Sequence, residues 1–150
     1  MAKRNAKRCP CGGGIYKTCC ERYHRGDDAP DAEALMRSRF SAFALGLGEY
    51  LFETLHPAHA LRARAKDEVV RELSRARQKT RYQALIVHEH EPGETQARVL
   101  FTARVFERGV DKSFSELSDF ERVDGAWRYR DGLTSPRSAA TIESFLEMFG

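Results

Sequence analysis

The stretch KSFSELSDFERVDGAWRYRD, from Lys112 to Asp131, decides the fold that this sequence predicts. Polar and apolar residues alternate on both sides of Asp124-Gly125, a dipeptide that strongly favours the tight turn of a β-hairpin. We therefore predict two antiparallel strands, residues 112–123 and 126–131, joined by that turn.

Two further strands are predicted immediately before this hairpin. Residues 82–90 are rich in β-branched and apolar side chains and stop at Glu91-Pro92-Gly93-Glu94, a turn sequence. Residues 95–107 alternate with a period of two, which places four apolar side chains on one face: Val99, Phe101, Ala103 and Val105. The four strands together predict an antiparallel meander.

Helical spacing precedes and follows these strands. An apolar stripe through Met36, Phe40, Phe43 and Leu47 predicts a helix from about residue 32, which two glycines interrupt. A short helix is expected over residues 50–56, a third from Asp67 as N-cap to about residue 78, and a last one over residues 141–149. Helices followed by a meander indicate an α+β domain with the helices on one face of the sheet.

The composition excludes several classes of protein. The chain has 150 residues, of which 41% are hydrophobic and 31% charged, which is typical of a folded domain. No apolar run approaches the roughly 20 residues of a membrane helix, and no apolar segment follows the basic start as in a secretory signal. We therefore expect a cytoplasmic protein without membrane contact, where thiols stay reduced.

All four cysteines lie close together near the N-terminus: Cys9, Cys11, Cys19 and Cys20. Four thiolates are a typical ligand set for structural Zn²⁺, and three glycines at 12–14 allow the chain to turn between the two pairs. His24 is an alternative fourth ligand, because adjacent cysteines do not always reach one metal. The other interpretations are a redox pair or a disulfide knot, which the reducing compartment disfavours, and four free thiols, which would be liable to oxidation when clustered so closely.

The charge is unevenly distributed. Seven Lys and Arg against one acid give residues 1–26 a net charge of +6, which leaves −3 for the rest of a chain that totals +3. A basic end can attract nucleic acid or an acidic protein surface, or it can simply be a solvated tail.

Three segments make the chain resemble a known family. Cys9-Pro10-Cys11-Gly12-Gly13-Gly14 with Cys19-Cys20 is similar to the zinc-binding SEC-C motif, although Gly13 replaces a common Ser and the loop is one residue shorter. The segments LMRSRFSAF (35–43) and FERVDGAWRYRDG (120–132) resemble the YchJ family of small bacterial proteins. The residues themselves predict a disordered basic tail at 1–8 and a linker at 27–31. The resemblance implies a SEC-C module at 9–26 and a nuclear-transport-factor-2-like cone at 32–150.

A cone of this kind can enclose a ligand pocket. If the last two strands face inward, the candidate pocket residues are Glu116, Tyr129 and Asp131, and His88 could join them. Aromatic surroundings would raise the pKa of such carboxyls toward values useful in acid–base chemistry. The competing interpretation is a filled core, with the acids in water or paired with Arg37 and Arg39.

The leading hypothesis is therefore a Zn²⁺-binding, non-enzymatic interaction protein, and we name no catalytic residue. Its SEC-C module would dock on an acidic protein or on a ribosomal or nucleic-acid surface, and the sheet could mediate a homodimer. The alternative is a small-ligand or enzymatic pocket of the isomerase or dehydratase kind in the cone.

Overall fold

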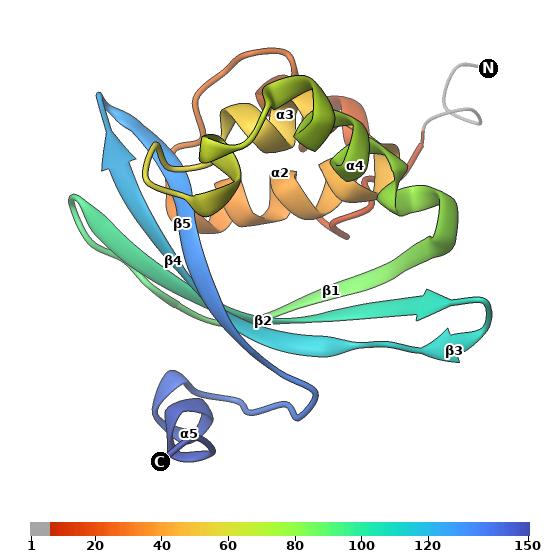
Figure 1. The fold of residues 1–150 in the computed structure, drawn as a ribbon. Helices are drawn as coiled ribbons and strands as arrows, with labels where there is room; N and C mark the ends of the chain where they lie inside the picture. The colour runs from red at the N-terminus through yellow and green to blue at the C-terminus, as the bar shows by residue number, and fades with distance from the viewer. Residues whose placement is uncertain (1–6) are drawn as a thin grey trace.

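The structure is a computed structural model, and it describes residues 7–150. One curved antiparallel sheet has the strand order β1-β2-β4-β5, with the short β3 paired to the end of β2 (Figure 1). Its strands are β1 (Thr80–Glu91), β2 (Gln96–Glu107), β3 (Val110–Asp111), β4 (Phe114–Val123) and β5 (Ala126–Ser135). The predicted α+β class and the meander are confirmed.

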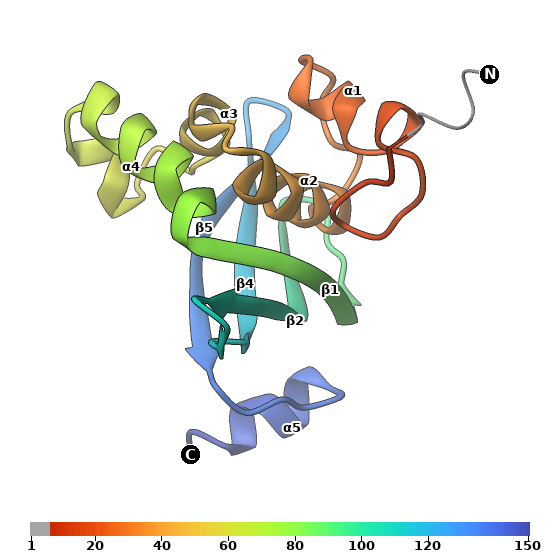
Figure 2. The ribbon, with the colours of Figure 1, turned by 90° about the vertical axis from the view of Figure 1, so that its right-hand side faces the viewer.

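The helices divide between the two faces of the sheet. Three helices lie over the concave face, and α5 lies on the opposite side near the C-terminus (Figures 1 and 2). The concave-face helices are α2 (Ala32–Leu45), α3 (Gly48–Glu53) and α4 (Lys66–Lys79), and α5 is Ile142–Glu147. Shorter helical turns are η2 (Tyr16–Thr18), α1 (Glu21–His24) and η3 (Ala60–Ala63). No helix of the described chain is long and apolar enough to cross a membrane.

The turn between β4 and β5 forms as the sequence predicts. Asp124 and Gly125 have φ angles of 51° and 84°, so both central residues adopt the left-handed conformation of a type I′ turn. Arg108 and Gly109, at 51° and 79°, make a second turn of this kind between β2 and β3. That second hairpin and β3 were not predicted.

Two apolar clusters explain the alternation along the strands. The predicted inward face of β2, from Val99 to Val105, is buried with Phe40 and Trp127 in the main core. The opposite face is buried only where α5 covers it, through Leu100, Leu117, Ile142 and Phe145. The last helix therefore packs on the back of the sheet.

Helix α2 is buried on more than one side. Asp31 caps its N-terminus by accepting a hydrogen bond from Ala34 N at 2.8 Å, and Gly46 ends it with φ 74°. Leu47, expected on its apolar stripe, therefore lies outside the helix. Its polar residues Ser38 and Ser41 are fully buried because the N-terminal module packs against this side.

Three predicted boundaries are wrong. The short helix expected over residues 50–56 is α3, which begins at Gly48 and ends at Glu53. Helix α4 begins at Lys66 with Ala65 as N-cap, so Asp67 lies in the first turn, where its charge complements the helix dipole. Strand β5 continues to Ser135 beyond the predicted end at Asp131. Its register shifts between Tyr129 and Asp131, which leaves Arg130 as a bulge.

The N-terminal module is ordered from Lys7 onward. Arg8 pairs with Ile15 in an antiparallel bridge, and the Lys7 carbonyl accepts a hydrogen bond from Tyr16 N at 2.9 Å. The tail expected at 1–8 is therefore ordered at its last two residues, and residues 1–6 lie outside the described chain.

Candidate functional site

Cysteine sulfurs from two turns of the N-terminal module converge on one point. The Sγ atoms of Cys9, Cys11, Cys19 and Cys20 all lie within 4.8 Å of one another. The Cys11–Cys19 separation is 3.5 Å and the Cys11–Cys20 separation is 3.7 Å. Zn–S bonds of about 2.3 Å place tetrahedral sulfurs about 3.8 Å apart, so the cluster fits a divalent metal.

The glycine loop shapes this cluster. Gly12 and Gly14 have φ angles of 84° and 128°, which side-chain-bearing residues rarely adopt. Gly13 is required for space, because a Cβ there would lie 2.9 Å from Cys19 Sγ and 3.2 Å from Cys11 Sγ. A serine at position 13 would therefore not fit without displacing a sulfur.

The environment shifts the pKa values of Cys9, Cys19 and Cys20 in different directions. Burial raises the pKa of Cys19 to about 12. The hydrogen bond to Cys11 likewise raises the pKa of Cys20, whereas hydrogen bonds from Cys11 and Cys20 lower the pKa of Cys9. A cluster that lowers the pKa of Cys9 while it raises those of Cys19 and Cys20 needs a cation to stabilise these groups together as thiolates.

The cluster is attached to α2. Ser41 Oγ lies 3.3 Å from Cys9 Sγ and donates a 3.3 Å hydrogen bond to Cys20 Sγ. Arg37 donates to the Cys11 carbonyl through Nη1 at 3.3 Å, and its Nε pairs with Glu33 at 3.0 Å. The module and the helix under it therefore form one packed unit.

His24, the alternative fourth ligand, lies outside the sulfur cluster. Its Nδ1 accepts a 2.7 Å hydrogen bond from Tyr16 OH, and its Nε2 donates a 2.8 Å bond to the Ser38 carbonyl. Burial lowers the pKa of His24, which favours this neutral form. The ring therefore joins the module to α2.

A second feature is a cavity of about 480 Å³ between α2 and the concave face of the sheet. Most of its wall is apolar and aromatic, and Glu116, Ser118 and Tyr129 lie at one part of it with Arg39 and His59. Glu116 Oε2 accepts hydrogen bonds from Tyr129 OH at 2.7 Å and from Ser118 Oγ at 2.6 Å. The structure thus brings Glu116 and Tyr129 together.

Asp131 and His88 do not line this cavity. The bulge at Arg130 turns the Asp131 side chain away from the cavity. Asp131 is the cross-strand neighbour of Asp119 on β4, and it is exposed. A second register shift lies beside His88, whose Nε2 is 2.7 Å from Thr102 Oγ1 on the opposite face of the sheet. The strict alternation used for the prediction does not hold through either bulge.

The expected pairing of these acids with helix arginines is also absent in residues 7–150. Arg37 binds Glu33, and Arg39 makes its hydrogen bonds to the Leu51 carbonyl and Thr54 Oγ1. Arg39 instead places its guanidinium 4.8 Å from the centre of the Tyr129 ring.

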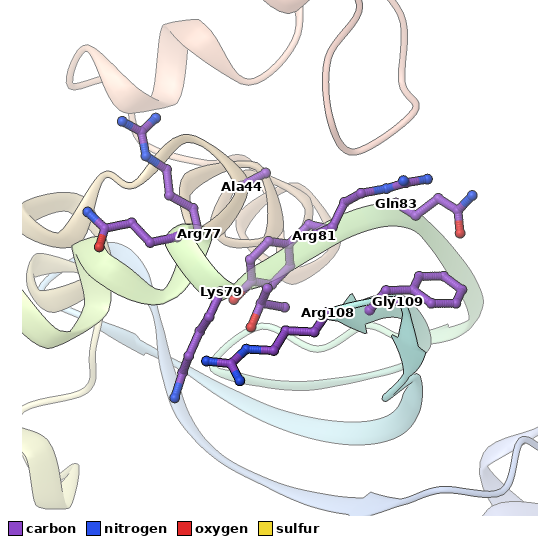
Figure 3. Close-up of a pocket in the computed structure, with 11 residues that line it drawn as sticks. Ala44, Arg77, Lys79, Arg81, Gln83, Arg108 and Gly109 are labelled. Atoms are coloured by element: carbon purple, nitrogen blue, oxygen red, sulfur yellow. The ribbon is translucent and has the colours of Figure 1, made fainter.

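A third feature is a basic groove that the sequence did not predict. A groove of about 640 Å³ at the junction of α4, β1 and the β2–β3 turn is lined by Arg77, Lys79, Arg81 and Arg108 (Figure 3). None of the described residues lining it is acidic. The Leu45 carbonyl holds Arg77 through a 2.9 Å hydrogen bond. The domain is mildly acidic in sum, and counting charge by segment therefore concealed this basic surface.

The comparisons with known proteins agree with this architecture. Residues 31–132 match the family model described as the middle NTF2-like domain of YchJ. A UPF0225 protein of Chromobacterium violaceum is 39% identical over 140 residues, which cover 89% of this chain and 98% of that protein. A UPF0225 protein of Corynebacterium efficiens is 41% identical over 131 residues, which cover 83% of this chain and 92% of that protein.

Two solved structures resemble this fold over most of the chain. A SEC-C motif containing protein from Rhodopseudomonas palustris aligns with a TM-score of 0.72 and 31% identity, over 85% of this chain and 98% of its own. A second SEC-C motif containing protein, from Psychrobacter arcticus, aligns with a TM-score of 0.70 and 27% identity, over 89% of this chain and 85% of its own. The class is thus an NTF2-like α+β domain with an N-terminal four-cysteine module.

Within that class, the chain belongs to the YchJ (UPF0225) family.

Proposed function

We propose that this protein is a Zn²⁺-binding, non-enzymatic interaction protein in which the metal fastens the N-terminal module to α2. The convergence of four Sγ atoms within 4.8 Å carries this proposal. Three of the four cysteines are buried, so the site is closed in the manner of structural zinc sites. Zn²⁺ would be held by Cys9, Cys11, Cys19 and Cys20, and it would supply folding energy to a module too small for a core of its own.

The same proposal assigns the basic surfaces to an acidic partner, a protein or a nucleic-acid surface. Lys17, Arg22 and Arg25 are exposed on the module, and the groove of Figure 3 adds a second basic surface on the domain. The groove has no acidic residue in its described lining, and such clustered cations attract polyanions through an interaction that salt weakens.

Charge reversal tests this part of the proposal. Lys17→Glu on the module and Arg81→Glu in the groove should each weaken binding of a fluorescent single-stranded RNA by several-fold in anisotropy titrations at low salt. Arg137→Glu carries the same charge change at an exposed site outside the module and the groove, so it is the matched control.

The affinity should fall steeply as salt rises, and polyglutamate in place of RNA reports on an acidic protein surface. If all three variants bind alike, or if the wild type binds neither probe at low salt, the basic surfaces are not docking sites.

A further inference from the structure

We propose that the cavity between α2 and the sheet binds a small amphipathic monocarboxylate, with Arg39 as the anchor for the carboxylate. This proposal is independent of the zinc module and of the basic surfaces. The chemistry of the cavity wall defines the ligand in three parts: a cation, a hydrogen-bonding group beside it and an aromatic chamber.

Arg39 is the first part. Its side chain is only 8% exposed, and no carboxylate in residues 7–150 lies within ion-pair distance of its guanidinium. Nη1 uses two acceptors, Leu51 O at 2.8 Å and Thr54 Oγ1 at 2.6 Å, and these bonds fix the group against the cavity. Nε and Nη2 make no hydrogen bond to the described residues. A buried cation is normally paired, so this one calls for an anion.

Glu116 is the second part. Tyr129 OH and Ser118 Oγ both donate to Oε2, so this carboxylate is already hydrogen-bonded within the cavity wall and is not the partner of Arg39. Gly132 makes room for this carboxylate, because a Cβ there would lie 2.1 Å from Oε2. The side chain is therefore held in place rather than free in solvent.

His59 adds a neutral donor beside these groups. Its Nδ1 accepts a 3.0 Å hydrogen bond from Leu61 N, so the ring proton is on Nε2. Burial, followed by the charge of Arg39, lowers the pKa of His59 and favours this uncharged ring. The ring centre lies 5.7 Å from that of Tyr129.

The third part is the aromatic chamber, which supplies the apolar contact. Phe40, Phe43, Tyr82, Phe101 and Phe114 line the remainder of the cavity. A single guanidinium binds a planar carboxylate through two parallel hydrogen bonds, whereas a dianion would meet the charge of Glu116. An aryl or branched alkyl monocarboxylate therefore matches the wall better than a phosphate ester.

The test compares acids with their neutral amides on the full-length protein. Phenylacetate, hydrocinnamate and indoleacetate are titrated by NMR, each beside its primary amide. We expect at least one acid to bind roughly ten-fold or more tightly than its amide, since a charged hydrogen-bonded pair is lost in the amide.

Two variants locate the binding. Arg39→Met should remove the preference for acid over amide, whereas Arg37→Met, on the same helix but outside the cavity lining, should retain it. Ala103→Leu narrows the apolar chamber without touching Arg39 and should weaken both acid and amide.

Thermal unfolding checks that each variant is folded. If Arg39→Met does not fold, Ala103→Leu still shows whether the acids and amides bind inside the cavity. Equal affinities for acids and amides, no binding of either at millimolar concentration, or an unchanged preference in folded Arg39→Met would overturn the proposal.

Discussion

Cys11→Ser is expected to release the metal and to lower the thermal stability of the whole protein. Cys11 is 1% exposed, and its sulfur lies within 3.7 Å of two other ligand atoms, so its loss opens the site. A metal present at about a thousand times its Kd stabilises the folded state by about 4 kcal/mol, and this contribution should disappear. Unfolding followed by circular dichroism, with and without a chelator, measures it.

The chelator gives the internal comparison. It should lower the Tm of the wild type and leave that of Cys11→Ser unchanged, because the variant has no metal to lose. Thr18→Ser, an exposed change in the same loop, should behave as the wild type does. A wild-type Tm that ignores the chelator would show that the module holds together without metal.

Hydrogen exchange should show where this stability is lost. Because Ser41 and His24 join the module to α2, exchange protection should fall in the Ser38–Ser41 turn of the helix as well as in the module. Loss confined to residues before α2 would contradict the packed unit described above.

Gly48→Ala is the second substitution with a large expected effect. A Cβ at position 48 would lie 2.2 Å from Val70 O and 2.2 Å from Ser74 Oγ, because α3 crosses α4 closely at this point. The Gly48 N–H also donates to Ser74 Oγ at 3.1 Å. Forcing the helices apart should cost about 3 kcal/mol of unfolding free energy, measured by urea denaturation.

A double variant identifies which atom is responsible. Ser74→Ala removes the side-chain contact but leaves the Val70 carbonyl, so it should not rescue Gly48→Ala. Gly109→Ala, in open space with φ 79°, gives the cost of an added methyl at a strained but uncrowded glycine, and it should be smaller. Full rescue by Ser74→Ala would mean that the backbones are not in close approach.

Local patterns in the sequence predicted the elements and the cysteine cluster well. Three such features depend on neighbours along the chain, and the structure contains each of them: the alternation in β2, the Asp124-Gly125 turn and the clustering of the four cysteines. The predicted start of the first long helix at about residue 32 also agrees with the structure, where Asp31 is the N-cap.

The candidate cavity was only half predictable, because side-chain direction in a strand depends on where bulges fall. One extra residue at Arg130 turns Asp131 to the other face, and nothing in the local sequence marks that position. Arg39 was expected to pair with an acid, but the distance between α2 and the sheet determines what it can reach. The basic groove joins residues from α4, β1 and the β2–β3 turn, which only the fold brings together.

The central claim is that the four cysteines hold one zinc ion. The most direct measurement is the metal content of the full-length protein purified without chelator, by inductively coupled plasma mass spectrometry with native mass spectrometry of the intact chain. The proposal predicts one Zn²⁺ per chain in the wild type and in His24→Ala, and none in Cys11→Ser. A wild-type zinc content far below one per chain, or full zinc content in Cys11→Ser, would contradict it.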